Sequence, residues 1–388
     1  MSFLFSRSKQ KSPSELVRSL NEAIQRVERQ GDRKKAIEEM QRWIFQIKSI
    51  LYGDEENDPQ IDLIALLAQE VYTSDVLVGV VNNLHQIDFD SRKDVVVIFT
   101  TLLRRKIGNR SPTVDYLVSR PNIFETLILH NGNQDTCLSA DAIVRDCAKY
   151  ESLTKLILSL SVFWNYFDYI HTAPFEMAAG AFATLNDILM TQEQVTAEFL
   201  RNNGVMFNQR ASELMRSDNY VTKRQSLKLV AQLLRHRANF NFMTMYIDDV
   251  DNLKLVMNLL KDKSKNIQNE AFHIFKIFVA NPKKSKPILD ILTKNKVRLL
   301  KFLSDFSTER SNDKEFEDEK SYIINNISAL PDLVPSSSVP STANPSRDTS
   351  PTPGIHGPIT QLHPEAIVRD QFYDQQDPQL QRAYVSHP

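Results

Sequence analysis

The chain has 388 residues, with 47 basic and 48 acidic side chains and a formal net charge of −1. This balance gives no general reason to expect nucleic acid or an anionic membrane as the principal partner. Only nine glycines occur, which is too few for the tight turns of an all-β fold or the phosphate-binding loops of a nucleotide-binding α/β fold. The prolines crowd after residue 330, so the preceding region is mostly free of helix breakers. We therefore expect an all-α protein.

Apolar residues recur every three or four positions through most of the chain, in segments separated by short polar turns. Ser12-Pro13 followed by Glu15 indicates the start of the first helix, and Pro174 and Pro287 suit first-turn positions. In chain order, the segments predict helices over residues 14–30, 61–72, 93–107, 138–148, 175–189, 221–234, 267–279 and 287–303.

The segments also repeat on a longer scale. The middles of successive helices fall at residues 93–95, 140–142, 180–182, 225–227 and 270–272, with separations of 47, 40, 45 and 45 residues. A second apolar helix follows each of them. A period of roughly 40–47 residues with two or three helices per unit is typical of HEAT and armadillo arrays. Because one repeat cannot bury its own apolar faces, the repeats must stack, and such stacks present long grooves that bind other proteins.

These patterns divide the chain into a helical-repeat domain, residues 1–330, and a Pro/Ser-rich tail, residues 331–388. The tail has too few large apolar residues to bury the area that would offset its chain entropy, so we expect it to be disordered. Ser350-Pro351 and Thr352-Pro353 within it have the pattern of proline-directed phosphorylation sites, which also arises by chance in such tails.

Cys137 and Cys147 have no Cys-x-x-Cys or Cys/His spacing around them, so we interpret both as buried thiols in a reducing compartment. The apolar cluster at residues 3–5 is too short for a signal peptide, and Ser2 argues against N-myristoylation. The longest apolar stretches fall far short of a membrane span. We therefore expect a cytoplasmic protein without a membrane partner.

No catalytic pattern is found in the sequence. The eight histidines form no metal-ligand pair, and there is no Gly-x-Ser-x-Gly turn, Walker loop or protein-kinase signature. The acidic clusters at residues 54–58 and 248–251 lack the central glycine and terminal glutamate of a calcium-binding EF-hand loop. We therefore expect no enzyme activity, no cofactor and no metal site.

One repeat concentrates basic and aromatic residues, namely Tyr220, Lys223, Arg224, Arg235, Arg237 and Phe240. Protein interfaces are rich in this mixture because the planar guanidinium and the rigid ring give much contact for little lost entropy. The same mixture could stack on single-stranded RNA, but no base-reading trio recurs in every unit, so nucleic acid is not the expected partner. A separate basic run at residues 104–106 has no aromatic neighbour and is interpreted as a solvated helix end.

Several segments carry a specific resemblance, at residues 50–53, 67–70, 87–89, 112–114, 197–200, 219–229, 252–255, 257–260, 279–282 and 287–292. Together they resemble the calcium-binding protein 39 family, also called the mouse-protein-25 scaffolds. The resemblance spans about residues 1–330. It implies a right-handed superhelix of armadillo-like helical repeats that acts as a monomeric adaptor without catalysis or a calcium site.

The resemblance also implies partners. Members of the family bind sterile-twenty-like (germinal-centre) kinases and a related pseudokinase, and with that pseudokinase they activate the liver kinase tumour suppressor. The long tail indicates a fungal member of the Hym type. Fungal relatives serve a morphogenesis network with a nuclear Dbf-related kinase, which implies enrichment at sites of polarised growth or division.

Two binding surfaces are implied by the same resemblance. A concave groove contacts the kinase N-lobe around its regulatory C-helix, and the matching positions are Phe175, Tyr220, Arg224, Arg237 and Phe240. A pocket near the C-terminal end receives a Trp-Glu-Phe-like tripeptide, and the matching positions are Met257 and Lys294, with Lys254 nearby. We therefore expect a scaffold that stabilises the closed, active kinase. An assembly adaptor without effect on kinase activity is the alternative, followed by a repeat-type RNA-binding protein.

Overall fold

The computed structural model describes residues 11–29, 32–53, 59–306 and 314–332. The tail predicted to be disordered therefore lies, apart from Pro331 and Asp332, outside the described residues. Within the described ranges the chain forms nineteen α-helices and three short 3-10 helices, and no β-strand. This composition confirms the predicted all-α class.

The α-helices follow one another with short connections, and their bounds in chain order are α1 (Pro13–Glu28), α2 (Arg33–Tyr52), α3 (Ile61–Tyr72), α4 (Val76–Asn82), α5 (Phe89–Arg104), α6 (Pro112–Val118), α7 (Pro121–His130), α8 (Cys137–Cys147), α9 (Glu151–Ser159), α10 (Asn165–Thr172), α11 (Phe175–Thr191), α12 (Glu193–Met215), α13 (Tyr220–Arg235), α14 (Phe240–Asp248), α15 (Val250–Leu259), α16 (Lys265–Ala280), α17 (Lys286–Lys294), α18 (Lys296–Asp305) and α19 (Lys314–Ser328). The 3-10 helices are η1 (Leu84–Gln86), η2 (Ser161–Trp164) and η3 (Arg237–Asn239).

Capping side chains set several helix starts. The backbone N–H of Glu15 donates to the Ser12 hydroxyl, and the backbone N–H of Ser12 donates to the Glu15 carboxylate, which completes a capping box at α1. Helix α5 begins four residues before the predicted start at residue 93, because the Asp88 carboxylate accepts a hydrogen bond of 2.8 Å from the N–H of Ser91. The prediction of a single helix over residues 287–303 was wrong, since α17 ends at Lys294 and α18 begins at Lys296.

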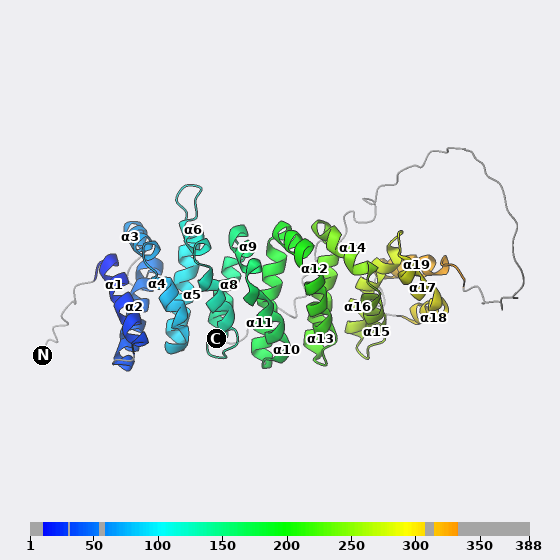
Figure 1. The fold of residues 1–388 in the computed structure, drawn as a ribbon, viewed down its shortest axis with the longest axis horizontal. Helices are drawn as coiled ribbons and strands as arrows, with labels where there is room; N and C mark the ends of the chain where they lie inside the picture. Colours follow the sequence, from blue (N-terminus) through cyan, green and yellow to red (C-terminus); the bar gives the residue numbers. More distant parts are fainter. Residues whose placement is uncertain (1–10, 30–31, 54–58, 307–313, 333–388) are drawn as a thin grey trace, which may run out of the picture. The chain divides into compact units, whose positions relative to one another are not determined.

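One helix from each repeat contributes to a ladder that runs along the stack (Figure 1). Helix α2 packs against α5, α5 against α8 and α8 against α11, and the series resumes with α13 against α16 and α16 against α19. Polar contacts join the neighbours, namely Lys48 with Asp94, Thr100 with Asp146, Asp141 with Thr184, Arg224 with Glu270 and Lys276 with Glu319. The two residues of each pair are 43 to 46 positions apart in the chain. This separation confirms the predicted armadillo-like period.

The apolar stripes of all these helices meet in one continuous core. Its largest fully buried side chains include Tyr166, Phe207, Tyr246 and Phe272, which come from α10, α12, α14 and α16. Each helix buries its stripe against the preceding and following repeats, so no repeat has a separate core. Among the described helices no single one is long and apolar enough to cross a membrane. The α3–α4 pair, bent by 73°, passes that test together on length and composition.

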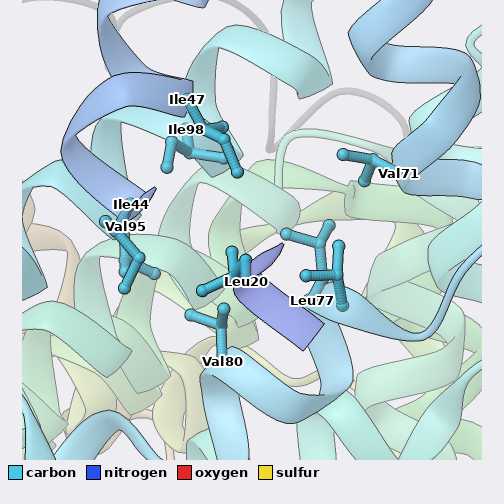
Figure 2. Close-up of a pocket in the computed structure, with 9 residues that line it drawn as sticks. Leu20, Ile44, Ile47, Val71, Leu77, Val80, Val95 and Ile98 are labelled. Carbon is cyan, nitrogen blue, oxygen red and sulfur yellow. The ribbon is translucent and has the colours of Figure 1, made fainter. Parts of the chain in front are cut away.

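A small cavity lies inside the first repeats, between α1, α2, α3, α4 and α5 (Figure 2). Its volume is about 10 Å³, and its lining is entirely apolar: Leu20, Ile44, Ile47, Val71, Val76, Leu77, Val80, Val95 and Ile98. A water molecule there would find no hydrogen-bond partner, so the cavity is a local packing defect.

Candidate functional site

Two aromatic side chains begin two helices of the ladder. Phe175 is the first residue of α11 and is 62% exposed, and Tyr220 is the first residue of α13 and is 44% exposed. The Asn219 carboxamide oxygen caps α13 by accepting from the N–H groups of Val221 and Thr222, at 2.9 and 3.2 Å. Phe175 and Tyr220 therefore both lie at the N-terminal ends of ladder helices, and α12 separates these two helices in the chain.

Arg224 lies one helical turn after Tyr220, on the seam between α13 and α16. Its Nη2 atom is 3.8 Å from Oε1 of Glu270, and the two side chains are 29% and 17% exposed. Its Nε atom is buried and has no hydrogen-bond partner among the described residues. The amide of Asn266, also on α16, donates a hydrogen bond of 3.1 Å to the Tyr220 hydroxyl. Both groove residues on α13 thus contact a side chain of α16.

Arg237 and Phe240 lie beyond the other end of α13. Arg237 belongs to η3, and Phe240 is the first residue of α14 and is 57% exposed. The 16 residues of α13 extend over about 24 Å. Four of the five residues predicted for the groove are therefore split between the two ends of α13, with Tyr220 and Arg224 at one end, whereas Phe175 belongs to α11. A partner that contacts all five must cover the whole length of this helix.

The residues predicted for the peptide pocket come from two neighbouring helices. Lys254 and Met257 lie on α15, Lys294 is the last residue of α17, and α15 packs against α17. The Met257 thioether is partly buried against the core, whereas both lysines are exposed. Lys254 forms an ion pair of 3.1 Å with Asp251 on its own helix. The cavity of Figure 2 is lined by other residues, so it belongs to neither predicted surface.

The remaining reactive groups of the described chain are dispersed or inaccessible. Both cysteines are free and buried, and burial raises the pKa of the Cys147 thiol, so the thiolate is disfavoured. No three His, Cys, Asp or Glu side chains of the described ranges come together as metal ligands. The acidic cluster at residues 54–58 lies outside those ranges. The residues predicted for the groove therefore offer aromatic and arginine side chains that another macromolecule could contact.

Asn266 and Glu270 were not predicted from the sequence. The signal that could have found them is their separation from the groove residues, because each lies 46 positions after Tyr220 or Arg224, close to the repeat period of 45 assigned to that pair of helices. Aligning the two repeats by helix start places Lys265 opposite Tyr220, one position before Asn266.

Comparison with known proteins gives a consistent result. The profile of a family described as Mo25-like matches residues 3–331. A human protein named calcium-binding protein 39-like is 44% identical over 333 residues, which cover 86% of this chain and 98% of that protein. The conidiophore development protein hymA of Emericella nidulans is 34% identical over 381 residues, which cover 91% of this chain and 99% of that protein.

Among solved structures, a computationally designed armadillo repeat protein for modular peptide recognition aligns with 69% of this chain and 100% of its own, at 13% identity and a TM-score of 0.42. The family assignment rests on the family profile and on the two sequence relatives, each of which aligns with this chain over nearly its whole length. The chain belongs to the Mo25-like family.

Proposed function

We propose that this protein is a non-catalytic scaffold that binds sterile-twenty-like kinases or pseudokinases and stabilises their closed, active conformation. In a fungal setting it acts as a monomer in the cytoplasm, at sites of polarised growth or division, within a morphogenesis network that includes a nuclear Dbf-related kinase. The alternative is an assembly adaptor that binds the same kinases without changing their activity.

The observation that carries the proposal is the exposure of Phe175, Tyr220 and Phe240 on a helical stack with one continuous core. These residues are 62%, 44% and 57% exposed, so a partner that covers them would bury apolar surface, which is favourable. Aromatic and arginine side chains dominate the energetics of protein interfaces. The Asn219 cap holds the start of α13, so little order has to be created at Tyr220 on binding.

Activation follows from differential affinity. A surface that fits the closed conformation of a kinase lobe binds that conformation more tightly and shifts the population towards it. The shift cannot exceed the difference in binding free energy, and about 1.4 kcal/mol corresponds to roughly tenfold. The scaffold therefore needs no catalytic group of its own.

A second contact supports the first. Met257 offers a soft, adaptable apolar surface for an aromatic side chain, and Lys254 and Lys294 offer positive charge for a carboxylate of the partner's tail. Because both surfaces belong to one stack, binding of the tail raises the effective concentration of the kinase lobe at the groove. Two weak contacts can then produce a stable complex.

Binding can be tested directly with a purified sterile-twenty-like kinase and the full chain, by isothermal titration calorimetry. We expect the wild type to bind, and Tyr220→Ala and Arg224→Ala each to weaken binding by about tenfold or more. Phe45→Ala is the matched control, since Phe45 on α2 is 55% exposed and lies outside both predicted surfaces. It should leave the affinity unchanged. No binding by the wild type, or equal losses in all three variants, would contradict the proposal.

A further inference from the structure

The seam between α13 and α16 contains a matched set of four residues. Tyr220 and Arg224 are one helical turn apart on α13, and Asn266 and Glu270 are one turn apart on α16. The Asn266 amide contacts the Tyr220 hydroxyl, and the Glu270 carboxylate faces the Arg224 guanidinium. Both contacts join residues 46 positions apart, so the two helices are parallel and in one register. Each groove residue of α13 therefore has its own partner on α16.

We propose that Asn266 and Glu270 are positioning residues of the partner-binding surface, which hold the side chains of Tyr220 and Arg224 in the orientation that the partner meets. Neither residue is among the positions that the family resemblance assigns to binding. The inference rests on the proposed function, because positioning matters only if Tyr220 and Arg224 contact a partner.

The physical reason is conformational entropy. An exposed tyrosine or arginine samples several rotamers, and fixing each such side chain on binding costs about 0.5–1.5 kcal/mol. The Asn266 hydrogen bond restricts the Tyr220 ring before the partner arrives. Glu270 does the same for Arg224, whose long side chain has more rotamers to lose. The partner then meets a surface that is already ordered.

The Arg224 contact also indicates the chemistry of the partner. At 3.8 Å the pair with Glu270 is longer than a hydrogen bond, so N–H donors of the guanidinium remain for a second carboxylate. Burial raises the pKa of Glu270, while Arg224, Lys228 and Arg235 lower it, so this acid faces several cations. The surface fits a partner that places a carboxylate at Arg224 and an apolar group on the Tyr220 ring.

A double-mutant cycle with the full chain and the sterile-twenty-like kinase tests the Asn266 contact. Asn266→Ala should weaken kinase binding about three- to tenfold in the wild-type background, as expected for loss of one hydrogen bond. In the Tyr220→Phe background, which lacks the hydroxyl, the same change should have no effect. Equal losses in both backgrounds would mean that Asn266 acts through something other than Tyr220, and no loss in either would also overturn the proposal.

Glu270 is tested against a control in the same seam. Glu270→Gln removes the charge that holds Arg224 and should weaken kinase binding about three- to tenfold. Asp262→Asn removes the charge that pairs with Lys223 at 3.3 Å, in the contact that joins α13 to the turn before α16, and should leave the affinity unchanged. Equal losses in the two variants would show general loosening of the seam and overturn the positioning role. Thermal melting of both variants establishes that each is folded.

The outcomes separate this inference from the proposed function. If the wild type does not bind the kinase, the proposed function fails and the inference fails with it. If the wild type binds and Tyr220→Ala abolishes binding, but Asn266→Ala and Glu270→Gln bind normally, only the positioning role is overturned.

Discussion

Thr184 on α11 donates a hydrogen bond of 2.7 Å to Oδ1 of Asp141 on α8, inside the seam between two ladder helices. Asp141 is 2% exposed, and its Oδ2 atom has no hydrogen-bond partner among the described residues. Burial raises the pKa of Asp141 from 3.8 to about 6, although the Thr184 bond, the nearby Asn131 side chain and the charge of Arg145 act in the opposite direction.

This carboxyl should make stability depend on pH. Below pH 3.8 it is protonated in both the folded and the unfolded chain, and its contribution is fully present. As the pH rises towards 6, the unfolded chain releases its proton first, so the free energy of unfolding falls. The loss is complete above the folded pKa and is on the order of 3 kcal/mol.

Asp141→Asn cannot ionise and should remove this dependence. Urea unfolding of both chains between about pH 4 and pH 7 measures it, and subtracting the two profiles cancels the buried histidines, which titrate in the opposite sense. The wild type should lose stability relative to Asp141→Asn across this window. Parallel profiles would show that Asp141 does not titrate as described.

Gly180 on α11 lies against the same Asp141 side chain. A Cβ atom at this position would lie 2.9 Å from Oδ2 of Asp141, which is the only neighbour within 4 Å. Gly180→Ala should therefore lower the free energy of unfolding by about 1–2 kcal/mol, even though alanine favours a helix. In the Asp141→Ala background the same change should be neutral or stabilising. A loss of equal size in both backgrounds would locate the strain elsewhere.

The apolar cavity of Figure 2 gives a stabilising prediction. Val80→Ile adds one methylene where unfilled space exists, and we expect it to raise the free energy of unfolding by about 0.5–1 kcal/mol. Val144→Ile, at a fully buried valine of α8 away from the cavity, is the matched control and should destabilise by about 1–3 kcal/mol through overpacking. Equal effects at the two sites, measured by urea unfolding, would contradict this reading of the cavity.

The second predicted surface can be tested with a synthetic peptide that ends in Trp-Glu-Phe. Met257→Ala should weaken its binding about tenfold, whereas Met257→Leu, which conserves volume, should change it little. Lys294→Ala should also weaken binding, and less so at high salt. Lys263→Ala removes an exposed lysine from the turn before α16 and serves as the charge control. Fluorescence anisotropy measures all four, and a peptide that binds every variant equally would exclude this surface.

The elements predicted best from sequence are those with a strong apolar stripe and a clear start. Helix α3 has the predicted bounds, and α11 begins at the predicted Phe175. Helix α2 was not among the predicted helices, because its first half is rich in charged residues that dilute the apolar pattern of Ala36 and Met40. The break at Asn295 was missed because the apolar period continues through it into α18.

For the candidate surface, the sequence predicts which residues are exposed but not which side chains of the neighbouring helix they contact. The exposure of Tyr220 follows from its place at a helix start, before the apolar stripe of α13 begins. The division of the groove residues between two ends of α13 also follows from the helix bounds. The contacts of Tyr220 and Arg224 with α16 depend on the register between two helices, which no local pattern contains. For that reason the repeat period points to Asn266 and Glu270 only to within one position, and the folded chain identifies them.

On the proposed function, this surface favours the active conformation of a kinase. The most direct test measures the rate of substrate phosphorylation by a purified sterile-twenty-like kinase at saturating concentrations of the full chain. The wild type should raise the rate by about tenfold, and Arg224→Ala at equal occupancy should raise it much less. Tight binding of the wild type with an unchanged rate would show that the protein is an assembly adaptor and not an activator.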